Sequence, residues 1–307
     1  PMCRKPLGSG GKRVRMRADG VDPGEGAVVF SGDLGRHDHP VLADREVPEG
    51  APTVLIESTY GDREHPEPEV PHAELAALIN RTVGRGGSVL IPAFAVDRTE
   101  VLLLTLQQMI AGRRIPADIP IWVDSPMGLA ALDVYRDREF AGEIGPEFRG
   151  RPFIRLPNLR EARSKEESIR LNSPARPSIV ISSSGMATGG RVVHHLHDML
   201  PDARNSVVFT GFQSPGTRGR ALVDGATELK MYGRYVPVRA EILQDREFSV
   251  HADASDLMDW LTEMVPRPQI VYCVHGERES AIALARRIKD DLGILAVVPK
   301  MAEVVRL

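Results

Sequence analysis

One local pattern repeats along the chain from Ser88 onward. A short run of β-branched apolar residues is followed by a loop of small residues and then by a segment with helical apolar spacing. Strands that alternate with helices in this way predict a parallel sheet with crossover helices, and therefore an α/β fold. Asp97, followed three residues later by Glu100, resembles a capping box at the start of the first such helix. The expected strands are 88–92, 119–123, 178–182 and 206–211, and the expected helices cover 100–110, the segment through 132 and 135, and 191–200.

Further strands are expected on both sides of this block. Two precede it, at 27–33 and 53–57, and each ends in an acidic residue, Asp33 or Glu57. In α/β sheets, ligands and catalytic groups gather at the carboxyl ends of strands, so these residues are candidates for function. Between 137 and 177 we expect only surface helices and loops. After the block we expect strands at 236–243, 269–274 and 294–299, and helices at 253–264 and 277–289.

Composition excludes several classes of protein. Hydrophobic residues at 42% and charged residues at 26% of a 307-residue chain are typical of a globular protein. The sequence has no run of roughly 18 apolar residues, so we expect no membrane span. The two cysteines, Cys3 and Cys273, cannot make a disulfide framework, which favours a reducing, cytoplasmic location. The net charge of −3 gives no overall attraction to nucleic acid, so local features would have to bind such a partner.

Four polar residues at expected strand ends or tight turns could carry chemistry: Asp33 in SGDLGR, Glu57 in ESTYGDR, His251 in SVHAD and His275 in VHGE. Each also has a structural interpretation. Asp33 could cap a turn, Glu57 could form a salt bridge, His251 could cap the helix that begins at Asp253, and His275 could be a hydrogen-bonded turn residue.

Eight motifs, in order along the chain, closely resemble the β-CASP branch of the metallo-β-lactamase-fold nucleases. That branch includes the RNA endonuclease of eukaryotic pre-mRNA 3′-end cleavage, its bacterial and archaeal relatives and, more distantly, RNase J. The resemblance implies a partial metallo-β-lactamase αββα sandwich, made of residues 1–65 and 235–307, with an inserted Rossmann-like β-CASP domain at 66–234. The motifs are SGDLGR, ESTYGDR, PAFAVDRTEVLL, DSPMG, SSSGMATGGR, FTGFQSPGTRGR, SVHADASDLMDWL and VHGERES.

The resemblance assigns roles to the four residues. Asp33 matches an aspartate that bridges two zinc ions, and His275 matches a histidine that ligates zinc. Glu57 and His251 match a carboxylate and histidine that pair, with the histidine placed to protonate the departing sugar oxygen. A histidine oriented by a carboxylate has the fixed tautomer that general-acid catalysis needs. The implied activity is metal-dependent hydrolysis of an RNA phosphodiester, with RNA as the partner and a homodimer as a possible assembly.

The loop from Ser182 to Gly190 lies between an expected strand and an expected helix. Backbone N–H groups and the helix dipole would there face an RNA phosphate, and an arginine at the start of the helix could add a bidentate contact. The alternative is a close strand-to-helix turn that needs small residues for packing. The candidate phosphate-binding residues are Ser184, Gly185, Thr188, Gly189 and Arg191.

The resemblance is incomplete at the metal site. The family carries an HxHxDH motif before the strand that leads to Asp33, and a GHxxGS-like turn between them. This sequence contains no HxHxDH, and the turn survives only as Leu7–Ser9, with Lys5 where the histidine would fall. Zinc sites need three or four protein ligands, so Asp33 and His275 alone would not hold a catalytic pair. We therefore expect a truncated form of a zinc-dependent nuclease, with impaired or no activity.

Two histidine-rich runs lie outside these motifs. The HDH run from His37 to His39 has metal-binding residue types at close spacing, but it does not recreate the missing motif, and we expect a solvated loop. His194 and His197 share one face of an expected helix, where packing or surface roles compete with an RNA contact.

Two further hypotheses remain open. The chain could be a non-catalytic RNA-binding or scaffolding protein that lacks the metal site. A small-molecule hydrolase on the same fold is a weaker interpretation, because the motifs of the inserted domain resemble the nucleic-acid branch.

Overall fold

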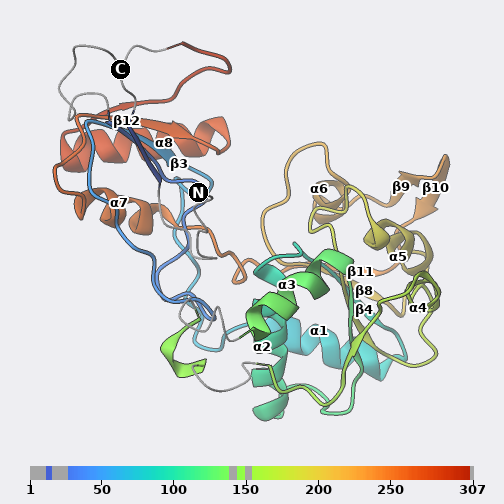
Figure 1. Ribbon diagram of the computed structural model, residues 1–307. Coiled ribbons are helices and arrows are strands. Elements are labelled where there is room, and N and C mark those ends of the chain that lie inside the picture. Colours follow the sequence, from blue (N-terminus) through green and yellow to red (C-terminus); the bar gives the residue numbers. More distant parts are fainter. Residues whose placement is uncertain (1–11, 16–26, 138–143, 149–153, 305–307) are drawn as a thin grey trace. The chain divides into compact units, whose positions relative to one another are not determined.

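The computed structural model describes residues 12–15, 27–137, 144–148 and 154–304 (Figure 1). The turn at Leu7–Ser9, Lys5 and Cys3 lie outside these described residues. The chain divides into two compact units, each with its own main sheet. Unit 1 comprises Pro1–His65, Gly142–Glu147 and Val250–Leu307, and unit 2 comprises Pro66–Ala141 and Phe148–Ser249.

Unit 1 contains a five-stranded sheet in the order β1-β2-β3-β12-β13. The pairs β2–β3, β3–β12 and β12–β13 are parallel, and β1 is antiparallel to β2. The carboxyl ends of β2, β3 and β12 therefore meet at one edge of the sheet. The strands are β1 (Lys12–Arg15), β2 (Ala27–Phe30), β3 (Thr53–Glu57), β12 (Ile270–Val274) and β13 (Leu295–Val297).

Two helices, α7 (Ala254–Thr262) and α8 (Arg278–Arg287), contribute to the core of unit 1, and a π-helical turn at Ile288–Leu292 continues α8. Alternate residues of β2, β3 and β12 point to one face of the sheet, where Val54 lies beside Val271 in the register. Trp260 and Leu257 of α7 and Leu284 of α8 are fully buried in the same cluster.

Unit 2 contains a six-stranded sheet in the order β11-β8-β4-β7-β5-β6, in which every pair is parallel. This confirms the parallel α/β arrangement that the repeated pattern predicts. All residues of β4, β7 and β8 are buried, as is typical of parallel strands covered on both faces. The strands are β4 (Val89–Pro92), β5 (Ile121–Asp124), β6 (Leu159–Glu161), β7 (Ile179–Ser182), β8 (Ser206–Phe209) and β11 (Glu241–Gln244).

The helices of unit 2 pack on this sheet (Figure 1). Leu90, Val180 and Val207 share one hydrophobic cluster with Val192 and Leu196 of α5, so α5 covers one face. Alternation along the strands directs Val89 and the other intervening residues to the opposite face. The helices are α1 (Ala73–Gly84), α2 (Arg98–Ala111), α3 (Pro126–Arg136), α4 (Lys165–Arg170), α5 (Arg191–Met199) and α6 (Arg218–Val223).

The capping-box prediction at the start of α2 is wrong. Asp97 is the N-cap residue, but it has a φ of 68° and makes no side-chain capping hydrogen bond. Its Oδ1 instead accepts a hydrogen bond from the Tyr135 hydroxyl at 3.2 Å. A tertiary contact therefore replaces the local one that the spacing indicates.

The segment from 137 to 177 contains more structure than we expected. The short helix α4 agrees with the expected surface helices, but the segment also contains the edge strand β6 and a 3₁₀ turn at Pro146–Phe148, and its residues Ala162 and Leu171 are buried in the core. A three-residue polar strand is too short to show an apolar period, so the pattern could not reveal it.

The single strand expected at 236–243 is two strands. β10 (Arg234–Pro237) forms an antiparallel hairpin with β9 (Glu228–Met231), and β11 pairs with β8 in the main sheet. Pro237 has no N–H group to continue a ladder, and the N–H groups of Arg239 and Ala240 bond to the Leu200 carbonyl. Unit 2 runs to Ser249, past the expected domain boundary at residue 235, so both the hairpin and β11 belong to unit 2.

The described part of the chain has no helix that combines the length and the apolar character of a membrane span.

Glu100 gives the fold a testable dependence on pH. Burial, assisted by the nearby Asp97 carboxylate, raises the pKa of Glu100 from 4.5 to about 8. The folded state therefore keeps a proton that the unfolded state releases above its pKa of 4.5, so stability falls as pH rises through this window. At about 1.4 kcal/mol per pKa unit, a rise from 4.5 to about 8 means that ionised Glu100 costs on the order of 5 kcal/mol.

We expect Glu100→Gln to match the wild-type free energy of unfolding at about pH 4 and to exceed it by several kcal/mol at about pH 9. Urea unfolding at a series of pH values measures this difference. Glu74→Gln is the matched control, because Glu74 is an exposed glutamate in the first turn of α1. Parallel curves for wild type and Glu100→Gln would contradict the prediction.

Candidate active site

Three of the four candidate residues follow neighbouring parallel strands of unit 1. Glu57 is the last residue of β3, His275 comes directly after β12, and Asp33 follows β2. The register places Val274 of β12 beside Glu57, so the ends of these two strands are level. His251 reaches the same edge from the segment before α7, where it forms an isolated bridge with Gly35. The structure therefore brings together four residues that are far apart in the sequence.

Glu57 and His251 form a hydrogen-bonded pair. The His251 Nδ1 atom lies 3.0 Å from Glu57 Oε2, and the Glu57 side chain is fully buried. The Leu34 N–H group donates to Glu57 Oε1, and the Glu57 N–H group donates to the Ser31 hydroxyl at 2.9 Å. The Leu34 N–H group and the His251 imidazole thus compensate a carboxylate that is removed from water, while the Glu57 N–H group ties the backbone to Ser31.

This pairing orients His251. A carboxylate at Nδ1 favours the tautomer with the proton on that atom and stabilises the imidazolium form, so Nε2 becomes the atom for proton transfer. The structural alternative for His251 does not hold, because Asp253 caps α7. Asp253 and Asp256 form a reciprocal capping box there.

Asp33 and His275 form a second, exposed pair. The distance between His275 Nε2 and Asp33 Oδ1 is 3.1 Å, and the two side chains are 60% and 66% exposed. The His275 ring centroid lies 6.3 Å from that of His251, so the two pairs are neighbours. A solvent-facing carboxylate beside an imidazole offers one oxygen and one nitrogen ligand.

The loop that carries His275 is held tightly against the end of β3. The Thr59 hydroxyl donates to the His275 carbonyl at 3.0 Å, and the Ser58 hydroxyl donates to the Val274 carbonyl at 2.9 Å. A Cβ atom on Gly276 would lie 2.5 Å from the Ser58 carbonyl oxygen, so only glycine fits this approach. His275 itself has a left-handed φ of 53°.

The described residues do not complete a zinc site around Asp33 and His275. Three groups of His and carboxylate side chains lie close enough to share an ion, and neither residue belongs to any of them. Zinc needs three or four protein ligands, and this pair supplies two. We therefore derive no chemical step through a metal from these residues.

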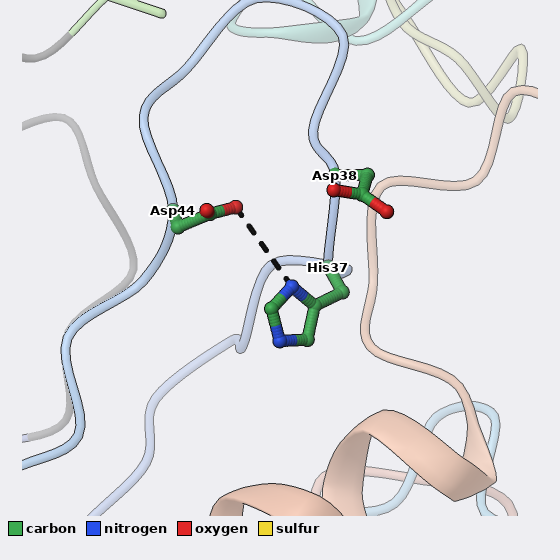
Figure 2. A group of neighbouring side chains, drawn as sticks. All are labelled: His37, Asp38 and Asp44. Carbon is green, nitrogen blue, oxygen red and sulfur yellow. Dashed lines mark ion pairs between the residues drawn. The ribbon is translucent and has the colours of Figure 1, made fainter.

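One of the three groups involves the HDH run. His37, Asp38 and Asp44 are all exposed, and His37 Nδ1 lies 3.8 Å from Asp44 Oδ1 (Figure 2). His39 is not part of the group, because its Nδ1 accepts hydrogen bonds from the N–H groups of Val41 and Leu42. The run therefore does not act as a single ligand set.

His65 is a part of the site that the sequence analysis missed. Its Nε2 lies 2.9 Å from the His251 carbonyl, and its N–H group donates to Asp253 Oδ2 at 2.9 Å. Burial lowers the pKa of His65, although the bond to the His251 carbonyl opposes the shift. A neutral His65 with its proton on Nε2 can donate to that carbonyl and fix the backbone of His251. His65 lies in a Pro-rich stretch that resembles a linker, so only its spacing of eight residues from Glu57 could have pointed to it.

The candidate phosphate loop of unit 2 follows β7 and leads into α5. Thr188 and Gly189 are exposed, and their N–H groups donate to the Ser184 hydroxyl at 3.0 and 3.4 Å. Gly185 is buried, and a Cβ atom there would lie 3.0 Å from the Phe94 nitrogen. The packing interpretation therefore explains Gly185, while phosphate binding by Ser184, Thr188 and Gly189 stays a prediction.

Arg191 is placed by a buried network at the end of β5. Its Nη1 donates to Asp124 Oδ1 at 2.5 Å, while His195 Nε2 and the Ser168 hydroxyl each bond to Asp124 Oδ2 at 2.6 Å. Asp124 and His195 are fully buried. Burial opposes ionisation of Asp124, but these three hydrogen bonds outweigh it and hold the pKa of Asp124 below its ordinary value. The network ties α5 to the sheet and so fixes the loop before it.

The fold and these residues define an α/β protein with a polar site at the carboxyl edge of a parallel sheet. Two family models match the chain: the Beta-Casp domain over residues 99–222, and the Zn-dependent metallo-hydrolase RNA specificity domain over residues 235–299. The chain belongs to the β-CASP branch of the metallo-β-lactamase-fold nucleases, as the ordered motifs predict.

Curated relatives agree with this assignment. The chain is 38% identical over 270 residues to Ribonuclease TTHA0252 of Thermus thermophilus, covering 87% of this chain and 61% of that protein. It is 30% identical to an RNase J-like protein of Methanocaldococcus jannaschii, covering 89% of this chain and 63% of that protein. It is 35% identical to Transcription termination factor FttA of Pyrococcus abyssi, covering 83% of this chain and 41% of that protein. The chain therefore spans less than two thirds of the length of these relatives.

The Asp124 network predicts a large effect of one substitution on stability. Asp124→Asn leaves the half-buried Arg191 and the fully buried His195 without their carboxylate, and we expect a loss of about 3–5 kcal/mol in the free energy of unfolding at neutral pH. Because the pKa of Asp124 is lowered, the difference should shrink only as the pH falls below its ordinary value of 3.8. Denaturant unfolding measures both effects. Asp133→Asn, at an exposed carboxylate of α3, should change stability by less than about 1 kcal/mol.

Proposed function

We propose that this chain functions in the hydrolysis of RNA phosphodiester bonds, with His251 as the general acid. The observation that carries the proposal is the His251–Glu57 pair, in which a buried carboxylate holds one ring nitrogen of a partly exposed histidine. The names of the relatives, ribonuclease and transcription termination factor, support RNA as the substrate.

In this proposal, Glu57 keeps the His251 ring in one orientation and stabilises its protonated form. His251 then gives a proton to the departing sugar oxygen as the phosphorus–oxygen bond breaks. The oxygen of a water molecule forms the new bond to phosphorus and releases one proton to the solvent, and His251 takes up a proton from the solvent before the next cycle. His65 acts as a positioning residue through the His251 carbonyl. A contribution of roughly 10²–10⁴-fold to the rate is typical of such a proton transfer.

We further propose that Asp33 and His275 are zinc ligands of this family site. The support is chemical: an oxygen and a nitrogen donor lie 3.1 Å apart beside the proposed acid, and the matching family model is named for Zn-dependent metallo-hydrolases. Ser184, Thr188, Gly189 and Arg191 remain the proposed contacts to the RNA phosphates at the start of α5.

A non-catalytic RNA-binding role is the second candidate. It is favoured by one observation: among the described residues, the Asp33–His275 pair has no third metal ligand within reach. A chain of this kind would bind RNA in a salt-dependent and chelator-independent manner, because phosphate contacts release counterions.

A cleavage assay tests the proposed function. With end-labelled single-stranded RNA and added zinc or manganese, we expect low turnover by the wild-type chain, because the described residues supply only Asp33 and His275 as metal ligands at the site. His251→Ala should lower that turnover by a further roughly 10²–10⁴-fold without weakening RNA binding. His37→Ala is the matched control, because His37 is an exposed histidine of the same unit outside the site.

Metal analysis of the purified chain separates the two candidates. Bound zinc that is lost in His275→Ala, together with turnover that requires His251, would establish the enzyme. RNA binding without turnover and without bound metal would favour the binding role. Turnover that is unchanged in His251→Ala would rule out the proposed acid.

A further inference from the structure

The tip of the β9–β10 hairpin has an unusual residue. Met231 pairs with Arg234, so Tyr232 and Gly233 form a two-residue turn, and both have positive φ values, 49° and 77°. Turns of this kind favour asparagine or glycine, because other side chains meet steric strain in the left-handed region. Tyr232 is nevertheless 58% exposed, so burial in a core does not explain it.

Helix α5 holds this tyrosine in place. The Tyr232 ring stacks on the His194 ring with a centroid distance of 5.1 Å, and its hydroxyl oxygen lies 3.1 Å from His194 Nδ1. The His197 ring meets the Tyr232 ring edge-on at 5.8 Å. The aromatic ring therefore has a fixed orientation although much of it faces solvent.

A pocket of about 430 Å³ opens at this point, lined by His194, His197, Asp198, Tyr232 and Arg234. Its volume is in the range of small-ligand sites. The lining combines an aromatic ring, two imidazoles, a carboxylate and a guanidinium. Such a set suits a nucleotide: the ring stacks on a base, Asp198 accepts a hydrogen bond from a base amino group, and Arg234 contacts a phosphate.

The position of the pocket connects it with the candidate phosphate loop. His194 and His197 follow Arg191, the first residue of α5, by roughly 4.5 and 9 Å along the helix axis. Arg218 donates to the Ala187 and Thr188 carbonyls of the loop at 3.2 Å each. Its charge also reaches Tyr232, where it partly offsets the rise in the pKa of Tyr232 that burial causes. One strand could therefore contact the loop and the pocket in succession.

We propose that this pocket is a base-stacking subsite for single-stranded RNA, with Tyr232 as the stacking platform. The inference rests on the proposed function, because it takes RNA as the partner of unit 2. The subsite would add a contact outside the His251 site, and this contact would hold the RNA strand in one register on the protein. Stacking of this type tolerates any base, since every base presents an aromatic face.

Binding measurements in chelator test the subsite without interference from cleavage. We expect Tyr232→Ala to weaken the binding of a fluorescent 12-nucleotide single-stranded RNA roughly tenfold in anisotropy titrations, as loss of one stacked base does. Tyr232→Phe should retain wild-type affinity, because it keeps the ring. Arg234→Ala should lower the slope of log Kd against log salt concentration by about one, and it provides a second test if Tyr232→Ala does not fold.

Tyr235→Ala is the matched control. Tyr235 is a tyrosine of the same hairpin with similar exposure, 65%, but alternation along β10 turns it to the face opposite Arg234 and away from the pocket. We expect it to bind RNA like the wild type. An oligonucleotide with abasic sites should bind the wild type more weakly than normal RNA, and Tyr232→Ala should remove this difference.

The outcomes distinguish the subsite from the proposed function. If the wild type binds RNA and Tyr232→Ala binds it equally well, the subsite is wrong and the proposed function stands. If the wild type binds no RNA at low salt, the proposed function fails and the subsite fails with it. If Tyr232→Ala instead changes the sedimentation of the protein without RNA, the pocket contacts a second copy of the chain and the inference is overturned.

Discussion

Removing an ionised carboxylate from water costs several kcal/mol unless donors surround it. Glu57 at the end of β3 and Asp124 at the end of β5 both meet that condition at the end of a parallel strand. Each gathers a histidine, His251 or His195, together with other hydrogen-bond donors. Because the buried charge tolerates little displacement of its donors, each carboxylate fixes the segment that carries its histidine.

The two pairs differ in the exposure of the histidine, and that difference separates their roles. His195 is fully buried, and both of its ring nitrogens face oxygen atoms, Nε2 at Asp124 and Nδ1 at Asn172. It can only stabilise the fold. The His251 side chain is 27% exposed beside Asp33 and His275. The same chemical pairing therefore supports packing in unit 2 and a candidate reaction site in unit 1.

Much of this arrangement follows from the sequence by simple rules. Short apolar runs locate the parallel strands, and polar residues directly after them locate the candidate site, because parallel strands place their carboxyl ends at one edge. The pairs Glu57–His251 and Asp124–His195 bring together residues far apart in the chain, and no local period encodes such contacts. Strand β6 and the β9–β10 hairpin escaped prediction because they are short and partly polar. The capping box failed because Tyr135 competes for Asp97.

Helix α5 shows how one short segment can serve several purposes. Its first residue, Arg191, and its buried residue His195 bind Asp124, which fixes the preceding loop. Because an α-helix turns 100° per residue, the adjacent His194 points outward, and His197 joins it one turn later. Within this run of four residues, His195 is buried and binds Asp124, while His194 and His197 lie on the outer face of the helix. A rigid helix with its inner face locked by a buried charge is a suitable support for Tyr232, since a stacking platform is effective only when its orientation is fixed before the ligand binds.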